Sequence, residues 1–594
     1  MIKESEVKEY PPVITGNLKI RGDEYIVIPD WRKLRKEFRV SERGSAQDGD
    51  KVIVELEQAG TADDADNPTA RVVESMGRAG YRDIEDLAIY RTMCIQPDFP
   101  SEVLQEAENL SDKIPETEIA ERLDLRELPT CTINPDDPDL APPITPNFGF
   151  ALSFAVKGDR YLLYSHFSDV SSFVKPESKI FAEAMKRGGT IFYPDRSIPM
   201  LPSRISEDLG NFRENQDRLA FTVINEFDSK GRICAQSFHK SIIRVDYNLS
   251  YVDVFSLNEG LNAMREISHP RNLEETLNSW FSIFHHYMNR KYNGSRERRG
   301  IISLLEDEWW VEFDEAGRLI RLDDYVFYED TANRFTGNAS SIANEYISRT
   351  LDIHNIPALY INQPSPEAAD MEKILRLIES YGIEVEKRSS PAHTFQSAIS
   401  FQLFGTSVTF YYLARKIIFP ERYSLQGKEH FSLALRNYTR CTSPLDRIGD
   451  LTMQYILNDS YFGKKERPGL TDSILERVIV QASRAERINH DLRRETEERY
   501  RKWYMRDQTG KIYKGLIVNF QKECIVVSLR PEELPVTGYI PIDDLKDDVY
   551  VLDDETMTLK GRKRTNLFRL NQNIRVKVKE ANTSIVFSYL GRIE

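Results

Sequence analysis

Short strand-like runs rich in valine, isoleucine and other apolar residues stand near both ends of this chain, and they constrain its fold more than any other feature. Residues 25–28 and 51–56 form two such runs near the N-terminus, and residues 525–529 and 574–578 form two near the C-terminus. Gly-Asp turns separate the N-terminal runs. Because several short strands at close spacing tend to close into a small barrel, the sequence predicts one barrel over residues 1–80 and another over residues 505–594.

The sequence between the two predicted barrels is different in character. Residues 81–128 read as a helical linker, in which Ser101 and Pro115 stand at helix starts. Residues 129–504 mix strand and helix patterns and end in a long charged helix from residue 472, where Ser473 and Glu476 have capping-box spacing. The predicted fold class is therefore α+β, with a mixed α/β body flanked by OB-type β-barrels. Such barrels often hold single-stranded nucleic acid, but they also bind proteins.

Composition narrows the class of protein. The net charge is −14 at pH 7, which argues against a uniformly basic nucleic-acid coat but allows a basic channel inside an acidic protein. The 5 cysteines lie far apart and form no CxxC pair, so we expect a reduced protein without a zinc site. No apolar run approaches the roughly 18 residues of a membrane span. We expect a cytoplasmic protein with no membrane partner.

Four segments of the middle part carry a more specific pattern. Residues 167–176 read FSDVSSFVKP, residues 192–202 read FYPDRSIPMLP, residues 356–360 read IPALY, and residues 430–444 read HFSLALRNYTRCTSP. They resemble the segments ADVSHYVKPG, YFPDRVVPMLP, LPALYR and HFGLAL…YTHFTSP of the RNase II/RNase R (RNB) exoribonuclease family. The resemblance covers nearly the whole chain. It implies a body of the RNB type, a cold-shock-like N-terminal barrel and an S1-like C-terminal barrel.

The family hydrolyses single-stranded RNA from its 3′ end with Mg²⁺ ions, which the aspartates of its TID and DFDDA segments hold. Carboxylates supply the charge that binds such hard cations. This sequence has TIN and NFGFA instead, so Asn134, Asn147, Gly149 and Phe150 occupy the aspartate positions. Asp446 stands where the family's TSPIRR segment has its first arginine, and a carboxylate there would repel phosphate. The resemblance therefore predicts no catalytic residue and no resident metal cofactor.

An acidic loop leaves one alternative open. Asp136, Asp137 and Asp139 lie between the two altered segments. They could rebuild a Mg²⁺ site, or they could form a solvated loop.

Several residues are candidates for RNA binding. The resemblance matches Tyr193 to a tyrosine that stacks on a base, and Arg447 to a basic residue that could contact phosphate. In the N-terminal barrel, Trp31 and Phe38 are interleaved with basic residues, as in a single-strand platform. In the C-terminal barrel, Tyr513 keeps a family aromatic. The alternatives are a packed strand residue for Tyr193, an ordinary surface arginine for Arg447 and a solvated loop around Trp31.

Three functions follow from these observations. The first, which the sequence favours, is an RNA-binding protein that holds single-stranded RNA without degrading it. The second is a scaffold that serves protein partners and no longer binds RNA. The third is an active 3′-to-5′ exoribonuclease with a rebuilt Mg²⁺ site.

Overall fold

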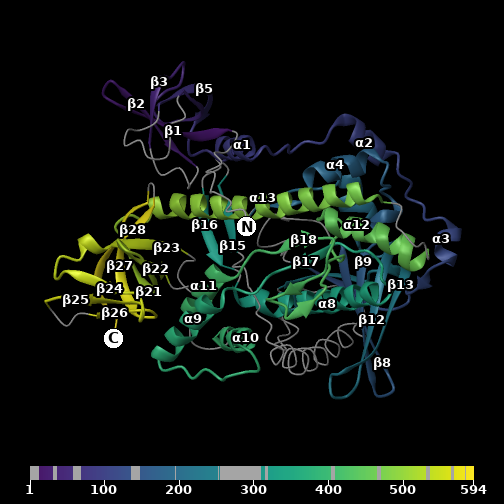
Figure 1. Ribbon diagram of the computed structural model, residues 1–594. Coiled ribbons are helices and arrows are strands. Elements are labelled where there is room, and N and C mark those ends of the chain that lie inside the picture. The colour runs from purple at the N-terminus through teal and green to yellow at the C-terminus, as the bar shows by residue number, and fades with distance from the viewer. Residues whose placement is uncertain are drawn as a thin grey trace. The chain divides into compact units, whose positions relative to one another are not determined.

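The computed structural model forms two compact units (Figure 1). Unit 1 comprises residues 1–100, 311–322 and 487–507, and unit 2 comprises residues 101–310, 323–486 and 508–594. The structure describes residues 13–30, 37–57, 69–134, 148–193, 196–251, 253–254, 309–314, 319–324, 326–402, 408–463, 470–529, 536–563, 567–581 and 584–593.

Unit 1 contains a closed five-stranded barrel with strand order β1-β2-β3-β5-β4. Its elements are β1 (Ile14–Arg21), β2 (Glu24–Pro29), β3 (Phe38–Glu42), β4 (Asp50–Leu56), β5 (Thr69–Arg78) and the following helix α1 (Arg82–Met93). Leu18 of β1, Val27 of β2 and Val52 of β4 point into the barrel and are fully buried. Gly22 has φ +64° in the β1–β2 turn, which a side chain would disfavour. The N-terminal barrel predicted from these runs is confirmed.

A buried cluster of four charged side chains also lies within unit 1. The Lys51 side chain is 1% exposed, and its Nζ lies 2.7 Å from Asp30 Oδ1 and 2.8 Å from Glu85 Oε2. Arg499 donates to Glu85 from the second half of α13 (Asp472–Arg506), at 2.9 Å. Burial raises the pKa of Asp30, but the charges of Lys51 and Arg499 outweigh burial and lower that pKa to about 2.

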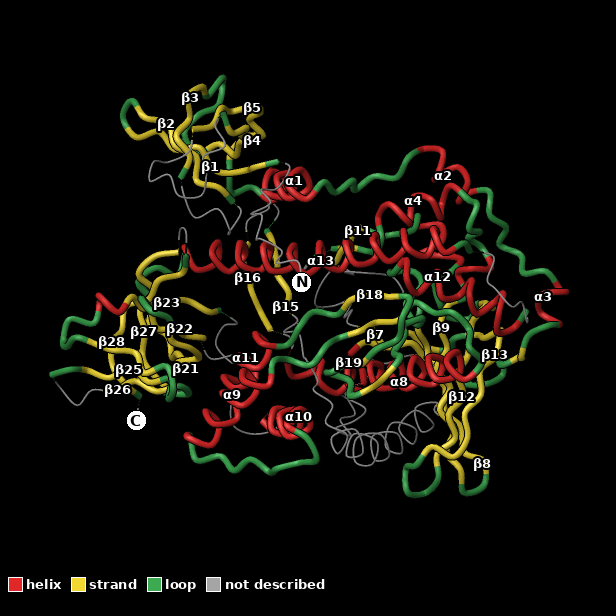
Figure 2. Tube along the Cα trace, in the orientation of Figure 1, coloured by secondary structure: helices red, strands yellow, loops and turns green. Residues whose placement is uncertain are grey.

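Unit 2 is built on a seven-stranded sheet with order β14-β7-β8-β9-β12-β13-β6 (Figure 2). Its strands are β6 (Leu123–Asp124), β7 (Thr130–Asn134), β8 (Phe150–Lys157), β9 (Arg160–Ser168), β12 (Asp217–Phe227), β13 (Ile233–Arg244) and β14 (Tyr247–Ser250). The two edge strands pair in parallel and the central ones are antiparallel. The linker predicted as helical does contain α2 (Ser101–Glu108) and α3 (Glu116–Ala120), but it also supplies β6. The exact domain boundaries stay predictions.

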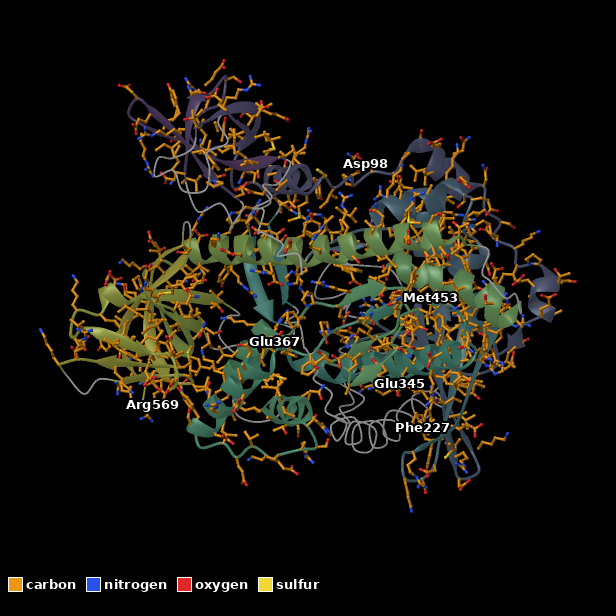
Figure 3. The ribbon with its side chains drawn as sticks, in the orientation of Figure 1. Asp98, Phe227, Glu345, Glu367, Met453 and Arg569 are labelled. Atoms are coloured by element: carbon orange, nitrogen blue, oxygen red, sulfur yellow. The ribbon has the colours of Figure 1, made fainter. Side chains whose placement is uncertain are left out.

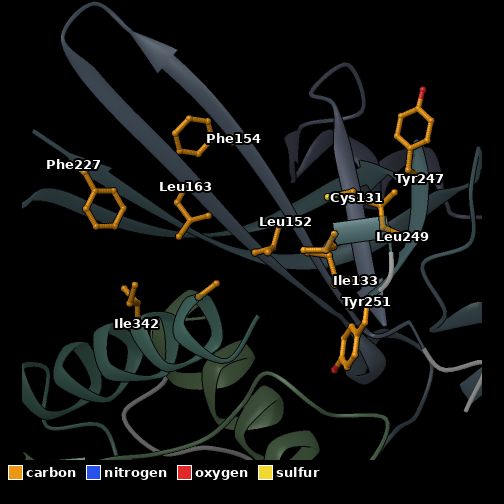
Figure 4. Packing of buried hydrophobic residues seen from close by; sticks show 12 residues of the cluster. Cys131, Ile133, Leu152, Phe154, Leu163, Phe227, Tyr247, Leu249, Tyr251 and Ile342 are labelled. Atoms are coloured by element: carbon orange, nitrogen blue, oxygen red, sulfur yellow. The ribbon is translucent and has the colours of Figure 1, made fainter. Parts of the chain in front are cut away.

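The long helix α8 (Val326–Ile353) packs against one face of this sheet. Figure 4 shows Ile342 of α8 facing the part of the sheet that carries Leu163 and Phe227, while Ile133 and Tyr251 lie farther along the same cluster. Figure 3 marks Phe227 at the end of β12 and Glu345 on α8. Burial of this apolar layer excludes water from the α8 face of the sheet.

The opposite face carries a chain of buried hydroxyl groups and one histidine. Hydrogen bonds of 2.6–2.9 Å join these side chains one after another across five strands, in the order Thr130, Ser153, His166, Thr222 and Ser241. We call these five residues the polar ladder. Burial lowers the pKa of His166 from 6.5 to about 3, so the ring is neutral at pH 7.

Shorter elements surround the sheet in unit 2. The helices are η1 (Val170–Ser172), α4 (Lys179–Arg187), η2 (Arg204–Leu209), α9 (Ala368–Ser380), α10 (Pro391–Gln402), α11 (Val408–Ile417), α12 (Ile448–Ile456) and η4 (Leu457–Phe462). The two-stranded pairs are β10 (Ile191–Phe192) with β11 (Ser197–Ile198), β15 (Trp309–Phe313) with β16 (Leu319–Asp324), β17 (Tyr360–Asn362) with β18 (Arg422–Ser424), and β19 (Glu429–His430) with β20 (Leu435–Arg436); β15 and β16 straddle the division between the units. Among the described helices, none is long and apolar enough to cross a membrane.

The C-terminal part of unit 2 is a second closed barrel, with order β21-β22-β23-β28-β27. Its elements are β21 (Ile512–Phe520), β22 (Cys524–Leu529), β23 (Thr537–Pro541), η5 (Ile542–Asp544), β27 (Asn573–Ala581) and β28 (Ile585–Arg592), with a three-stranded sheet of β24 (Tyr550–Asp553), β25 (Thr558–Gly561) and β26 (Leu567–Arg569). The backbone N–H of Leu570 donates to Tyr381 Oη at 3.0 Å, which ties this barrel to the end of α9. The predicted C-terminal barrel and the α+β class are confirmed.

Candidate functional site

Asn134 ends β7, the first of the altered motif positions that the structure describes. Its Nδ2 donates to Thr132 Oγ1 at 3.2 Å, and Asn248 Nδ2 donates to the same hydroxyl at 2.6 Å. A neutral amide therefore stands at this strand end and donates to a hydroxyl that Asn248 also contacts.

The second altered segment leads into β8. The backbone N–H of Phe148 donates to Asn211 Oδ1 at 3.1 Å, and the carbonyl of Gly149 accepts from the N–H of Ser168 at 3.0 Å. Phe150 stands opposite Phe167 in the sheet, and its ring packs against the apolar cluster between the sheet and α8. Asn147 and the aspartates Asp136, Asp137 and Asp139 lie outside the described residues.

α8 holds the loop that carries the TSPLDR segment. Asn344 Oδ1 accepts from the backbone N–H of Cys441 at 3.0 Å, and Asn344 Nδ2 donates to Thr442 Oγ1 at 3.3 Å. The hydroxyl groups of Ser340 and Thr442 lie 2.7 Å apart. These bonds fix the backbone around residues 441–443 relative to the sheet.

The end of this loop places Arg447 against a buried carboxylate. Both Asp450 oxygens accept from the Arg447 guanidinium at 3.0 Å, and Asp450 also accepts from the N–H of Ser443 at 2.9 Å. The Arg447 side chain is 31% exposed. Its charge is thus paired within the loop, and its predicted contact with phosphate stays a prediction. The backbone carbonyl of Asp446 accepts from the N–H of Thr190 at 2.8 Å, which brings the β10–β11 hairpin beside this loop.

The charge of Arg440, in the same loop, is also balanced by carboxylates. Arg440 NH1 lies 3.3 Å from Glu421 Oε2, and it also pairs with Glu486. His430 Nε2 lies 3.0 Å from the other Glu421 oxygen. Burial raises the pKa of Glu421, but Arg440 and His430 outweigh burial and lower that pKa to about 2. Glu421 is therefore charged at neutral pH and serves as a counter-ion.

Comparison with known protein families identifies the family of the central domain. The RNB domain model matches residues 122–463, and the cold shock domain model matches residues 26–100. The chain belongs to the RNB family. Ribonuclease R of Aquifex aeolicus is 29% identical over 558 residues, which cover 92% of this chain and 76% of that protein. Ribonuclease R 1 of Lactococcus lactis is 27% identical, covering 87% of this chain and 62% of that protein.

Solved structures agree on the fold. The Mycoplasma genitalium RNase R in complex with ribose methylated single-stranded RNA has a TM-score of 0.81 at 22% identity, covering 97% of this chain and 89% of that one. Yeast Ssd1, described as a pseudonuclease, has a TM-score of 0.69 at 12% identity, covering 98% of this chain and 83% of that one. Both structures thus share the fold of this chain over nearly its whole length.

Within the RNB body, the exposed aromatic ring of the β10–β11 hairpin is Phe192 and not Tyr193. Tyr193 is 3% exposed, and the Arg196 guanidinium lies 4.5 Å from the centre of its ring. Burial argues against the stacking role predicted for Tyr193. Phe192 is 43% exposed. The sequence held a signal for an exposed ring at Phe192, because Phe192 aligns with the tyrosine of the family's YFPDR segment.

The other predicted RNA-binding residues differ in their settings. Phe38 is 2% exposed and packs in the core of the N-terminal barrel, so its ring offers no open face to a base. The reason is register, because β3 turns this residue inward. Trp31 lies outside the described residues. Tyr513 is half-buried, and its hydroxyl donates to Gln508 Oε1 at 3.0 Å.

The donor set for a metal can be tested against the Mg²⁺ that active RNB members use. Across the described ranges, no group of three or more His, Cys, Asp or Glu side chains is placed to hold a metal ion. At the motif positions the structure has the amide of Asn134, the hydrogen of Gly149 and the ring of Phe150. The amide of Asn134 offers one neutral oxygen and the other two side chains offer none, so these residues cannot offset the charge of a hard divalent cation.

Proposed function

We propose that this RNB-family chain binds single-stranded RNA and does not hydrolyse it. The observation that carries the proposal is the replacement of the motif carboxylates, with the amide of Asn134 donating to the Thr132 hydroxyl and the partly buried ring of Phe150 packed against the apolar cluster between the sheet and α8. Two metal ions need several negative oxygens to offset their charge and to replace their bound water. An amide and an aromatic ring supply neither.

The altered loop supports the same conclusion. Phosphoryl chemistry needs cations at the position where negative charge develops. Here Asp446 adds a carboxylate beside the motif, while Arg447 is paired with Asp450. The net effect is a site with less positive charge for a scissile phosphate than the family pattern implies.

Support for RNA binding comes from the kept framework. The fold is similar over 97% of this chain to that of RNase R from Mycoplasma genitalium, which was solved in complex with ribose methylated single-stranded RNA. The likeness to the pseudonuclease Ssd1 shows that the same fold occurs in a protein described as lacking nuclease activity. We further propose a cytoplasmic protein in which protein partners join, rather than replace, the RNA.

A paired binding and cleavage assay tests the proposal. Purified protein is mixed with a 5′-labelled single-stranded RNA and millimolar Mg²⁺, and an active ribonuclease R is assayed in parallel. We expect binding that weakens as salt rises and a full-length RNA after prolonged incubation. Mg²⁺-dependent trimming that Asp136→Ala abolishes would instead support a rebuilt metal site. Failure to bind RNA at low salt would instead support a protein-binding scaffold.

A further inference from the structure

β13, in the sheet of unit 2, is paired along only a small part of its outer side. It has 12 residues and pairs with β12 along nearly all of them, but its outer neighbour β6 pairs only with Ser241 and Ile242. On this outer side, the carbonyl of Ile242 accepts from the N–H of Leu125 at 2.9 Å, and the carbonyl of Gln236 accepts from the Tyr346 hydroxyl at 3.2 Å.

Two backbone positions between these contacts are open. Every second residue of a strand directs its N–H and C=O groups to the same side, so those of Phe238 and Lys240 point outward with those of Gln236 and Ile242. Across the described ranges, these groups of Phe238 and Lys240 have no hydrogen-bond partner. Such unpaired groups are a template for a further strand. We call this stretch of β13, from Gln236 to Lys240, the β13 edge.

α8 crosses the strands of the sheet and continues past this edge (Figure 2). The hydroxyl of Ser165, on β9, donates to the carbonyl of Ala339, and the hydroxyl of Tyr346 reaches Gln236 of β13. From residue 339 to residue 346 a helix advances by about 10 Å, close to the two strand spacings of about 5 Å that separate β9 from β13. From Tyr346 to Ile353 it advances by about 10 Å more, so it extends under the place of one further strand.

The part of α8 beyond β13 exposes apolar surface. Ile342, Tyr346, Arg349 and Ile353 recur at helical spacing, so they lie on one face of the helix. Ile342 is 1% exposed under the sheet, whereas Ile353 is 67% exposed beyond its edge. A strand added to β13 would therefore cover a helix face that the present sheet leaves open.

Aromatic rings and cations surround this open place. The ring of Tyr461 lies 5.7 Å from that of Phe238 and 6.2 Å from that of His354. Lys240 and Arg349 form no ion pair with a carboxylate in the described part of the chain; Arg349 donates to the side chain of Gln236 instead.

The charge at this edge argues against self-association. β13 has no acidic residue, so pairing with a second copy of the chain would bring cations together without a counter-ion. An acidic partner is the better match.

We propose that the β13 edge binds an extended, acidic segment of a partner protein as an added β-strand. This inference rests on the part of the proposed function in which protein partners join the RNA, and it locates their surface. The backbone of the segment pairs with Phe238 and Lys240, an apolar side chain covers Ile353, and acidic side chains meet Lys240 and Arg349. A phosphate backbone only accepts hydrogen bonds, so RNA would leave the outward carbonyls unpaired.

A designed peptide tests this inference on the full chain. The probe is the end-capped, fluorescent peptide TETVTET, which places its glutamates and its valine on one side when extended. Its affinity is measured by anisotropy for the unchanged protein, for Ile353→Asp and for the matched control Ile512→Asp, whose isoleucine is 60% exposed on β21. We expect Ile353→Asp to weaken binding by about tenfold or more and Ile512→Asp to have no effect. Hydrogen exchange of β13 should slow when the peptide binds.

A charge exchange gives a second, independent readout. The peptide TKTVTKT should bind the unchanged protein about tenfold more weakly than TETVTET. Lys240→Glu with Arg349→Glu should reverse that preference.

Several outcomes would overturn the inference. They are no binding of TETVTET at millimolar concentration, an equal loss in both isoleucine variants, and binding that leaves the hydrogen exchange of β13 unchanged. A dimer of the unchanged protein that Ile353→Asp dissociates would assign the edge to a second copy instead. Displacement of the bound peptide by an oligouridylate would assign it to RNA.

RNA binding by the same variants keeps the proposed function separate. Ile353→Asp should retain the RNA affinity of the unchanged protein. If the unchanged protein binds no RNA, RNA binding fails as its function, whereas only the peptide results decide whether the β13 edge takes a strand.

Discussion

At positions 192 and 193, two adjacent aromatic residues have opposite environments. Residues next to each other in an extended segment point to opposite sides, so one ring turns outward when the other packs. Phe192 is the exposed ring, while Tyr193 lies under Arg196. Stacking on a base requires an open ring face, which favours Phe192.

Phe192→Ala is expected to weaken RNA binding by about tenfold, since stacking contributes about 1–3 kcal/mol per base. Its thermal stability should change little, because the ring is already exposed. Tyr193→Ala should behave in the opposite way and lower the melting temperature through loss of buried contacts. Anisotropy with labelled RNA and a thermal melt measure the two effects. Weaker binding only in a well-folded Tyr193 variant would return the stacking role to Tyr193.

His166 is the one titratable group in the polar ladder. Its pKa of about 3 in the folded chain lies below the ordinary value of 6.5. Between these two values the unfolded chain takes up a proton and the folded chain does not. The stability that neutral His166 contributes is therefore complete above about pH 6.5 and is lost as the pH falls toward 3.

From pH 7 to pH 5, this linkage should cost about 2 kcal/mol of unfolding free energy. We expect His166→Gln to be less stable at pH 7, because the ladder loses hydrogen bonds, and to be less sensitive to the same acid step. Urea unfolding midpoints at the two pH values measure the difference. His490→Gln, at an exposed position on α13, should keep the acid sensitivity of the unchanged protein. Equal acid sensitivity in the His166 variant would refute the linkage.

At the scale of elements, α8 carries a structural residue and a dispensable one within two turns. Asn344 is buried and bonds the backbone of Cys441. Gly337 is exposed, and a Cβ there would meet no atom within 4 Å. A helix-interior glycine is less favourable than alanine because it loses more backbone freedom on folding.

The two α8 substitutions should therefore differ in sign. Asn344→Ala is expected to destabilise the fold by about 1–3 kcal/mol, since it leaves the N–H of Cys441 without its acceptor. Gly337→Ala is expected to stabilise the fold by up to about 1 kcal/mol. Chemical unfolding of the two variants beside the unchanged protein measures both effects. A destabilising Gly337→Ala would show that this position makes a contact that its open surroundings do not explain.

Many elements were predictable from the sequence because their signals are local. The helix start at Ser101 coincides with the start of α2, and the start predicted at residue 472 coincides with that of α13. The capping box read at Ser473 and Glu476 was wrong, because Ser473 lies inside the helix and the hydroxyl of Thr471 accepts from the N–H of Ile474. Apolar runs and turn residues likewise located β2 and β4 of the N-terminal barrel and β22 and β27 of the C-terminal barrel, while the other barrel strands had no signal as clear. β6 was not predicted, because a two-residue strand has no period of its own and exists only through pairing with β13.

The sequence predicted which residue types occupy the candidate site, but it did not predict which way their side chains point. Motif positions identified Asn134, Gly149 and Phe150 as residues that replace carboxylates. The sequence could not show that Phe38 faces inward, because its side depends on the pairing of β3 with its neighbours. It also could not show that Arg447 pairs with Asp450, since that contact depends on how the loop enters α12.

At the scale of the whole molecule, unit 1 joins segments from both ends of the chain. Glu85 and Arg499 are 414 residues apart in sequence, yet they form a direct ion pair. Lys51 completes the cluster from inside the barrel. A buried cluster of this kind is costly to break, because removing one partner leaves charges uncompensated away from water.

Lys51→Met should therefore destabilise unit 1 by about 3–5 kcal/mol, since Asp30 and Glu85 then share Arg499 alone. Hydrogen exchange of peptides from β1–β5, read by mass spectrometry, isolates this unit from the rest of the chain. Lys19→Met, at an exposed position of β1, should leave the exchange unchanged. The cluster also fixes an acid response: the lowered pKa of Asp30 gives stability that is present above about pH 4 and is lost as the pH falls through about 2. Unchanged protection of β1–β5 in a folded Lys51→Met variant would mean that apolar packing alone holds the barrel to α1 and the second half of α13.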